Sequence, residues 1–533
     1  MSAKRIRLSV AQETPPLSGA GLLGLVTTGL YDDPLSIYRE YIQNSADAAE
    51  GSTIPPEARV DITVDPMGRY IRIHDNGPGL SRDDAFERLL PVGRSEKRPA
   101  IDRGFRGVGR LAGLAFAKTV TFTTRSCKER PITRITWHNE RLLELTSTES
   151  ELEKAILDCV DVETLPGSEY PEHFFEVEIR DVARHAAGVL LNRDAVRDYI
   201  GEVCPVPLSA DFPFAPDVDE LFNGIRSPFA LEVMLEGDSA PVRRPYGASV
   251  PLSSSKSADF TEFQIVRIPS VDDGAEAAIG WIAHSTYLGA IPREHRIRGI
   301  RARVGNIQIG NETTFDDLFV EERFNRWCVG ELHILDSRIV PNTKRDYFQP
   351  GPHLRNLENE LSPVLRCIST RCRQESKERN RDRKFRLALD NIDDLIALAT
   401  SGYLAAQDST DLVKRAEREL SALRKKIGNG RLTDGVLQRL ESTREGLVDI
   451  VFDDTAGQFQ GMTPSQVVIY QNIFRALADL ASSPSSARAL IELVFAEASA
   501  ILQVDDGLNA NRPANNHSQA RLVLDDTGKL IPR

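Results

Sequence analysis

Several common structural devices are scarce or absent in this chain. Its 533 residues include only six cysteines and no Cys-x-x-Cys pair, which argues against a disulfide scaffold or a zinc framework. No apolar run approaches the length of a membrane span, and the N-terminal segment lacks the apolar stretch of a secretion signal. The scattered thiols and the missing membrane signals together predict a cytoplasmic protein that does not enter a membrane.

Basic residues are also fewer than acidic ones, 66 against 78, which gives a formal net charge of −12. A protein with this balance is not expected to coat nucleic acid in general, although local basic patches leave nucleic acid open as a partner. A chain of this length is expected to form roughly three to four domains.

The stretch that organises the prediction is YREYIQNSADAAE, residues 38–50. Glu40, Asn44 and Asp47 follow one another at helical spacing, so they lie on one face of a helix. A carboxylate and an amide stacked in this way can activate water and hold Mg²⁺, which prefers oxygen ligands. The alternative is an amphipathic surface helix with a few polar residues.

A β-hairpin is predicted next, from the alternating ARVDITVD (58–65) and the returning RYIRIHDNGPGL. It ends in Asp75, followed closely by Gly77 and Gly79. A carboxylate there can accept a hydrogen bond from an exocyclic amine, while the glycines let the backbone approach a planar base. The alternative is an ordinary Asp-Asn-Gly-Pro turn.

A glycine-rich segment then precedes the apolar stretch 111–117, which is predicted to be a helix. Glycine-rich turns before a helix expose backbone N–H groups to an anion, and Lys97 could reach the same phosphates. The alternative is that the glycines only allow the chain to bend. The residues concerned are Gly104, Gly107, Val108 and Gly109.

These three stretches, in this order, resemble the nucleotide-binding boxes of the GHKL superfamily, which includes gyrase, the ninety-kilodalton heat-shock chaperone, histidine kinases and MutL. The opening LLGLVTTGLYDDPLSIYREYIQNSADA is especially similar to the chaperone family. The resemblance covers residues 19–180. It implies an α/β sandwich that holds ATP between its helices and a lid.

The resemblance also implies a role for each matching position. Glu40 matches the general base that activates the attacking water, Arg39 the arginine that pairs with it, and Asn44 the Mg²⁺ ligand. Asp75 matches the carboxylate that binds the adenine amine. The remaining nucleotide contacts implied by the family are Asp47, Gly77, Gly79, Lys97, Gly104, Gly107, Val108 and Gly109.

One departure from the family concerns the adenine site. The family has a Gly-Thr pair at the start of a late strand, and here that strand is HFFEVEIRDV (173–182), with Phe in place of the threonine. Adenine recognition is then either looser, or another hydroxyl such as that of Ser168 substitutes.

Residues 229–347 read mostly as strands, which favours an α+β middle domain. Its last loop, residues 341–346, could be a simple basic turn. It also resembles the chaperone's catalytic loop, in which Arg345 matches the arginine that reaches the ATP γ-phosphate and Lys344 is its neighbour. Such an arginine stabilises the charge that develops on the transferring phosphoryl group.

From residue 353 onwards the pattern is helical, and it does not match the chaperone's own dimerisation domain. A basic run at 371–386 is more typical of a solvated helix face than of a nucleic-acid contact. We therefore expect an α/β multidomain protein. Its predicted parts are a GHKL α/β sandwich (1–185), an α+β middle domain (186–350), an all-helical region with a role in dimerisation (351–504) and a flexible tail (505–533).

The leading functional hypothesis is an ATP-hydrolysing, ATP-gated clamp that works as a homodimer on protein clients or partners. One alternative keeps the clamp and replaces the client by DNA, as in MutL-like and MORC-like relatives. Another is an ATP sensor within a bacterial defence or signalling system. The presence of Glu40 and Arg345 argues against pure sensing.

Overall fold

The computed structural model divides into two compact units, Met1–Ser376 and Lys377–Arg533, which are described separately. The α/β multidomain class is confirmed, with mixed sheets in the first unit and helices in the second. No helix among the described residues is long and apolar enough to span a membrane. The described residues are 33–50, 52, 57–91, 109–145, 158–223, 230–272, 274–342, 344–427, 432–448, 458–506, 522–524 and 530–532.

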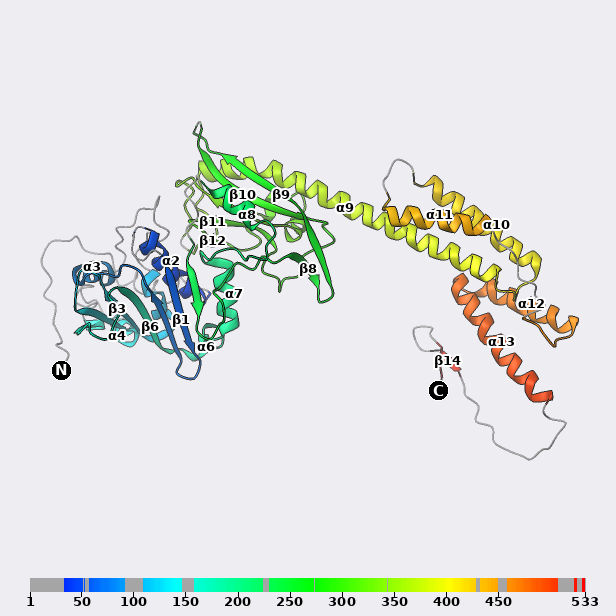
Figure 1. Cartoon of the computed structure of the whole chain (residues 1–533), viewed down its shortest axis with the longest axis horizontal. Helices are drawn as coiled ribbons and strands as arrows, with labels where there is room; N and C mark the ends of the chain where they lie inside the picture. The colour runs from blue at the N-terminus through cyan, green and yellow to red at the C-terminus, as the bar shows by residue number, and fades with distance from the viewer. Residues whose placement is uncertain are drawn as a thin grey trace, which may run out of the picture. The chain divides into compact units, whose positions relative to one another are not determined.

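The first sheet has seven strands in the order β5-β4-β3-β6-β2-β1-β7. Figure 1 labels its strands β1, β3, β4 and β6. Neighbouring strands are antiparallel except β7, which runs parallel to β1. The predicted hairpin is confirmed, since Val60 to Asp65 pair with Asp75 to Tyr70. The strands are β1 (Arg59–Asp65), β2 (Tyr70–Asp75), β3 (Ala117–Arg125), β4 (Ile132–His138), β5 (Val160–Leu165), β6 (Phe174–Val182) and β7 (Glu232–Leu235).

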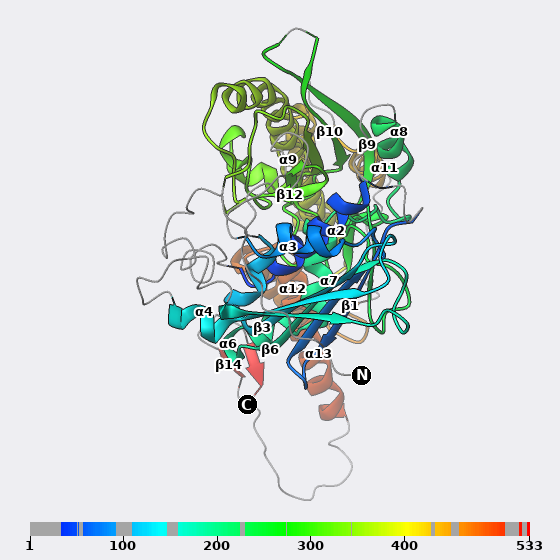
Figure 2. The ribbon, with the colours of Figure 1, turned by 90° about the vertical axis from the view of Figure 1, so that its left-hand side faces the viewer.

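All helical elements of this region except α8 contribute to one hydrophobic core with the first sheet, and Figure 2 shows α2 and α7 beside its strands. Helix α8 packs in a separate cluster that includes residues of the second sheet. The short segment η1 is a 3-10 helix, where a helix over 111–117 was predicted. The helical elements are α2 (Ser36–Glu50), α3 (Arg82–Leu89), η1 (Gly109–Ala115), α4 (Asn139–Leu145), α6 (Arg184–Leu190), α7 (Arg193–Val203) and α8 (Ala215–Phe222).

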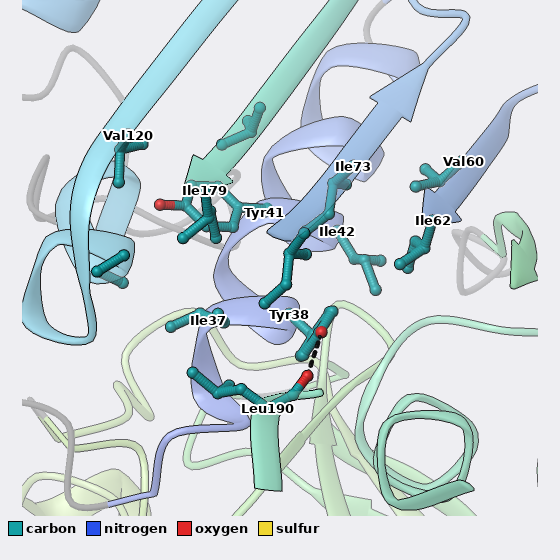
Figure 3. Packing of buried hydrophobic residues seen from close by; sticks show 14 of the residues in the cluster. Ile37, Tyr38, Tyr41, Ile42, Val60, Ile62, Ile73, Val120, Ile179 and Leu190 are labelled. Carbon is teal, nitrogen blue, oxygen red and sulfur yellow. Dashed lines mark hydrogen bonds between the residues drawn. The ribbon is translucent and has the colours of Figure 1, made fainter. Parts of the chain in front are cut away.

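Helix α2 is buried on most of its surface, because it lies among the sheet, η1 and α7. Its side chains Ile37, Tyr38 and Ile42 are completely shielded from solvent. The Tyr38 hydroxyl donates to the backbone oxygen of Leu190 at 2.7 Å, as Figure 3 shows. The Tyr41 hydroxyl donates to the oxygen of Arg110 and accepts from the N–H of Gly113, both at 3.0 Å. These bonds fix the helix that carries Glu40.

The second sheet has six strands in the order β12-β11-β13-β10-β9-β8. Buried ion pairs stabilise it, since the Glu331 carboxylate lies between the guanidinium groups of Arg244 and Arg303. The stretch TTFDDLFVEERFNRWCVG (313–330) has a helical sequence pattern, but its only helical segments in the structure are the 3-10 segments η2 (Asp316–Leu318) and η3 (Glu322–Trp327). The strands are β8 (Ser249–Ser253), β9 (Lys256–Pro269), β10 (Glu276–Ser285), β11 (Gly299–Val304), β12 (Ile307–Ile309) and β13 (Val329–Ile334).

Helices follow the second sheet, as predicted. They are α9 (Pro352–Ala399), α10 (Ala406–Lys425), α11 (Asp434–Val448), α12 (Pro464–Leu480) and α13 (Pro484–Asp506). In the second unit, α9, α10 and α11 share one apolar cluster, and a second cluster involves α12 and α13. The two short strands β14 (Leu522–Leu524) and β15 (Leu530–Pro532) pair within the predicted tail.

Two predictions need comment at this level. Leu22, Leu23, Val26 and Leu30 recur at helical spacing and predict a first helix, but this stretch lies outside the described residues. The domain boundaries at 185 and 350 stay predictions, and β7, beyond the first of them, pairs with β1 in the first sheet.

Candidate functional site

The polar face of α2 carries the residues on which the prediction depends. Glu40 is buried, while Asn44 and Asp47 are partly exposed. The Arg39 guanidinium donates to Glu40 Oε1 from Nε at 3.3 Å and from Nη2 at 3.1 Å. Both side chains of this pair are about nine-tenths buried, at 12% and 10% exposure. Arg39 and Glu40 therefore form a shielded ion pair.

Arg345 reaches the same carboxylate from far along the chain. Its Nε lies 3.8 Å from Glu40 Oε1, and its Nη1 donates to the Gln43 side-chain oxygen at 2.5 Å. The predicted site residues Glu40, Arg39 and Arg345 are thus brought together. Lys344, the alternative cation, is exposed on the same loop.

The loop that carries Arg345 is fixed at both ends. Pro341 and Phe348 form an isolated antiparallel bridge, and the Phe348 side chain is buried in the core of the second sheet. Arg345 adopts a left-handed backbone conformation with φ of 58°, and its carbonyl accepts from Gly310 N–H at 2.8 Å. A non-glycine residue in this conformation costs free energy and is found where the surroundings determine it. The loop therefore holds the guanidinium next to α2.

Asp75 lies at the end of β2 with its carboxylate buried. Oδ2 accepts from the Ser45 hydroxyl at 2.7 Å, and Oδ1 accepts from Gly77 N–H at 2.9 Å. Burial raises the pKa of Asp75, and these two hydrogen bonds only partly offset that rise. A carboxylate placed in this way has remaining lone pairs for one further donor, such as the amine of an adenine ring.

The two glycines after Asp75 are required by close contacts. Gly79 has a φ of +65°, and a Cβ atom there would lie 1.9 Å from the Arg125 carbonyl oxygen. A Cβ on Gly77 would lie 2.7 Å from Asp75 Oδ1. A side chain at Gly79 would displace the backbone, and one at Gly77 would displace the Asp75 carboxylate, so the glycines keep the backbone close to the buried carboxylate.

Gly109 is the predicted lid residue that the structure describes, at the start of η1. A Cβ on Gly109 would lie 2.2 Å from Glu40 Oε2, so the backbone passes directly beside the second carboxylate oxygen. Glu40 thus has Arg39 and Arg345 at Oε1 and Gly109 at Oε2. The other predicted lid residues lie outside the described part of the chain; they are Lys97, Gly104, Gly107 and Val108.

Sequence reasoning missed Ser45 and Gln43. The hydroxyl that binds Asp75 comes from Ser45 on α2, whereas Ser168 is exposed on the turn after β5. Phe175 pairs with Asp75 across the sheet, so no hydroxyl is available from that position. Ser45 directly follows Asn44, but nothing in that position predicts its hydrogen bond to Asp75. Nothing local in the sequence distinguishes Gln43.

The donor set suits a nucleotide better than a metal held by the protein alone. Within the described residues, no group of three or more His, Cys, Asp or Glu side chains could hold a metal ion. Mg²⁺ in phosphate sites commonly takes one or two protein ligands and completes its shell with water and substrate oxygens. Asn44 could serve as such a ligand, and the buried Asp75 beside two obligatory glycines fits an amine-bearing base.

A separate hollow of ≈ 750 Å³ lies between α7 and the segment 237–251. None of the predicted site residues lines it. Two of its three arginines are already paired, Arg197 with Asp238 and Arg296 with Glu202. We therefore place the site at α2.

Comparison with known proteins supports the same region. Residues 36–161 match the family described as histidine kinase-, DNA gyrase B-, and HSP90-like ATPase. Chaperone protein HtpG of Chromobacterium violaceum is 32% identical over 172 residues, which are 28% of this chain and 26% of that protein. HtpG of Mesorhizobium japonicum is 36% identical over 93 residues, 15% of each chain. HtpG of Paraburkholderia xenovorans is 32% identical over 141 residues, 22% of each chain.

The chain therefore matches about a quarter or less of the length of these relatives, as the coverages of 26%, 15% and 22% state. The family match over residues 36–161 contains α2, the Asp75 turn and Gly109. Residues 36–161 are thus similar to the ATPase domain of the GHKL superfamily, and part of the chain is similar to HtpG chaperones of the Hsp90 family.

Proposed function

We propose that this protein hydrolyses ATP to ADP and phosphate, and that Arg345 completes the catalytic site formed on α2. The observation that carries the proposal is the approach of Arg345 to Glu40 and Gln43 within one chain. An arginine that reaches a candidate general base from a distant segment is typical of phosphoryl-transfer sites, where it stabilises developing charge.

At the adenine end, the proposal assigns recognition to Asp75. Its carboxylate accepts a hydrogen bond from the exocyclic amine, while Ser45 and Gly77 hold it in position. The Gly77 and Gly79 backbone lies against the base. Ser45 takes the place of the threonine hydroxyl that the family carries on the strand now occupied by Phe175.

At the phosphate end, Glu40 accepts a proton from the water that attacks the γ-phosphorus. Arg39 orients the carboxylate through its bonds to Oε1. Arg345 stabilises negative charge on the transferring phosphoryl group, since its planar guanidinium can donate two parallel hydrogen bonds. Bound Mg²⁺, for which Asn44 is the proposed ligand, supplies charge neutralisation at the phosphates. Asp47 and the lid residues Lys97 to Gly109 are the remaining proposed nucleotide contacts.

We further propose that the ATPase drives a homodimeric clamp that acts on protein clients or partners. The support for dimerisation is an exposed apolar face on α12, where Ile469, Ile473 and Leu480 recur at helical spacing and are 58%, 41% and 83% exposed. The similarity to chaperone proteins supports a protein client. A cytoplasmic location is proposed because all six cysteines are free thiols.

The DNA-binding alternative is not favoured by the basic run on α9. Arg371 pairs with Glu262 and Arg373 with Glu321, so part of its charge is used within the chain. Nucleic acid remains a weaker hypothesis, and it would show as binding that falls steeply with salt concentration.

The test is ATP hydrolysis by the wild type, Glu40→Gln and Arg345→Ala, with ATP binding measured in parallel. Glu40→Gln should bind ATP and lose about 10²–10⁴-fold in turnover, the usual effect of removing a positioned base. Arg345→Ala should lose on the order of 10³-fold or more. Glu87→Gln is the matched control, because Glu87 is exposed on α3.

Each outcome selects a different function. If Arg345→Ala hydrolyses ATP normally while Glu40→Gln is inactive, the catalytic role proposed for Arg345 is wrong. If the wild type binds ATP and does not hydrolyse it, the protein is an ATP sensor.

A further inference from the structure

Arg110 follows Gly109 directly, and its backbone is fixed beside α2. The Tyr41 hydroxyl donates to the Arg110 carbonyl oxygen at 3.0 Å, and Gly113 N–H donates back to that hydroxyl at 3.0 Å. Gly109 itself lies in contact with Glu40 Oε2. Arg110 is therefore held one residue away from the carboxylate at the proposed reaction centre.

The guanidinium of Arg110 is shielded from solvent and poorly satisfied. Its Nε and Nη2 atoms are buried and have no hydrogen-bond partner among the described residues. No carboxylate of the described residues forms an ion pair with it. Burial, with no compensating carboxylate, lowers the pKa of Arg110 to about 10.

Other buried arginines of this protein are different. Arg303 donates to Glu331 at 2.7 Å, and Arg244 also pairs with that carboxylate. Arg301 pairs with Glu202. The described residues thus provide an acid for each of these three buried guanidinium groups and none for Arg110.

A buried charge without a counter-ion destabilises the folded protein by several kcal/mol. The presence of Arg110 at this position therefore indicates that its counter-ion is a bound anion and not a group of the protein. The position beside Gly109 and Glu40 restricts the anion to the phosphate end of the site. A guanidinium is a suitable ligand there, because its donors match the oxygens of a phosphate group.

We propose that the Arg110 guanidinium binds the phosphate chain of the nucleotide, and that the phosphate oxygens provide the negative charge that no described carboxylate provides. The inference rests on the proposed function for the identity of the nucleotide, but it concerns binding and not hydrolysis. Arg110 is then a residue that distinguishes a nucleotide from its nucleoside.

The experiment compares wild type, Arg110→Met and Arg110→Lys in the full-length protein. ATP and adenosine affinities are measured by calorimetry, and the melting temperature of the free protein by thermal unfolding. Arg110→Met should bind ATP about 10- to 100-fold more weakly, the effect of losing a hydrogen bond to a charged group. Its affinity for adenosine should be unchanged, and Arg110→Lys should lose less than Arg110→Met.

A purely structural role predicts the opposite pattern in the free protein. If Arg110 only supports η1, the methionine variant should melt at a lower temperature and lose ATP and adenosine affinity equally. Under the proposal, its melting temperature should equal or exceed that of the wild type, because an unpaired buried charge has been removed. Arg267→Met is the matched control, since Arg267 is exposed in the middle region and paired with Glu276.

The result that overturns the inference is an Arg110→Met protein with wild-type affinity for ATP, or with equal losses for ATP and adenosine. A wild type that neither ATP nor sodium pyrophosphate stabilises against heat overturns it too. A wild type that binds ATP without hydrolysing it defeats the proposed ATPase and leaves this inference standing.

Discussion

At the scale of single residues, the buried carboxyl group of Asp75 shows how a binding site costs stability. Burial raises its pKa above the ordinary value of 3.8, and the Ser45 and Gly77 hydrogen bonds do not fully cancel that effect. A carboxylate that the fold holds charged in spite of burial lowers the stability of the free protein. Such a group is retained for a ligand and not for folding.

Asp75→Asn should therefore separate binding from stability. The variant should bind ATP about 10- to 100-fold more weakly, because asparagine has no charge to attract the adenine amine. The free protein should be at least as stable as the wild type, since the Ser45 hydroxyl can turn to accept from the new amide. Calorimetry with ATP and thermal unfolding without it measure the two effects.

The dependence of stability on pH tests whether the pKa of Asp75 is raised in the folded protein. Above the ordinary value of 3.8, the unfolded chain has lost the Asp75 proton while the folded chain still holds it. Wild-type stability therefore falls as the pH rises through the interval up to the raised pKa, and the asparagine variant lacks this fall. The stability advantage of the variant should grow across that interval; an advantage that shrinks would contradict the assignment.

Sequence analysis located the candidate site residues that belong to a recognisable local motif. Glu40 and Asp75 stand at fixed positions in short patterns, and Arg345 in a recognisable loop. Ser45, Gln43 and Arg110 owe their roles to partners from other segments. Ser45 acts through Asp75, Gln43 through Arg345, and Arg110 through a missing carboxylate, so no local pattern could reveal them.

At the scale of elements, strand β13 carries a buried polar row that makes the second sheet sensitive to acid. His333 lies beside Glu331, with Nε2 3.1 Å from Oε2, and near Arg244 and Arg303. Burial lowers the pKa of His333 to about 4, the arginines add to this, and Glu331 opposes it. The folded protein therefore holds this imidazole neutral at pH values where the unfolded chain protonates it.

Wild-type stability should fall as the pH decreases from 6.5 towards 4, because the unfolded state binds the proton first. The fall due to one histidine is at most about 1.4 kcal/mol per pH unit. His333→Gln cannot take up this proton, so its melting temperature should depend less on pH over this range. His185→Gln, with His185 exposed on α6, is the control that should keep the wild-type slope. Equal slopes for wild type and His333→Gln would refute the prediction.

The elements show a similar division between what local pattern predicts and what it does not. Strands β1 and β2 follow from alternating apolar residues around a Met-Gly turn, and that hairpin is confirmed. The stretch containing β7 is also readable as a strand. Its pairing with β1 cannot be predicted from the local sequence, because parallel strands are joined by long connections. The register of the pair depends on how α7 packs in the core that the two strands share.

At the scale of the whole chain, α9 belongs to both compact units. Its N-terminal part, down to Cys372, packs in the core of the second sheet, and the next residue of α9 in an apolar cluster is Phe385. The two clusters share no residue. A helix that passes between two independent cores can be cut between them without removing a core side chain from the first unit.

A protein that ends at Ser376 should therefore fold and bind ATP with the affinity of the full chain, because every described residue of the site lies before that point. If α12 and its exposed apolar face carry the proposed homodimer, the shortened protein should be a monomer where the full chain is a dimer. Light scattering after size-exclusion chromatography measures both masses, and calorimetry measures ATP binding.

The molecular mass tests the homodimer and the ATP affinity tests the binding site, so each prediction can be contradicted without the other. A shortened protein that remains dimeric would move the dimer contact to the first unit, and a monomeric full-length protein would refute the homodimer. Replacing Ile473 by Glu in the full chain provides the finer test, because Ile473 is 41% exposed on α12 and a charge there costs little in a monomer. In a dimer that buries this face, the same unpaired carboxylate would be desolvated and the dimer should dissociate.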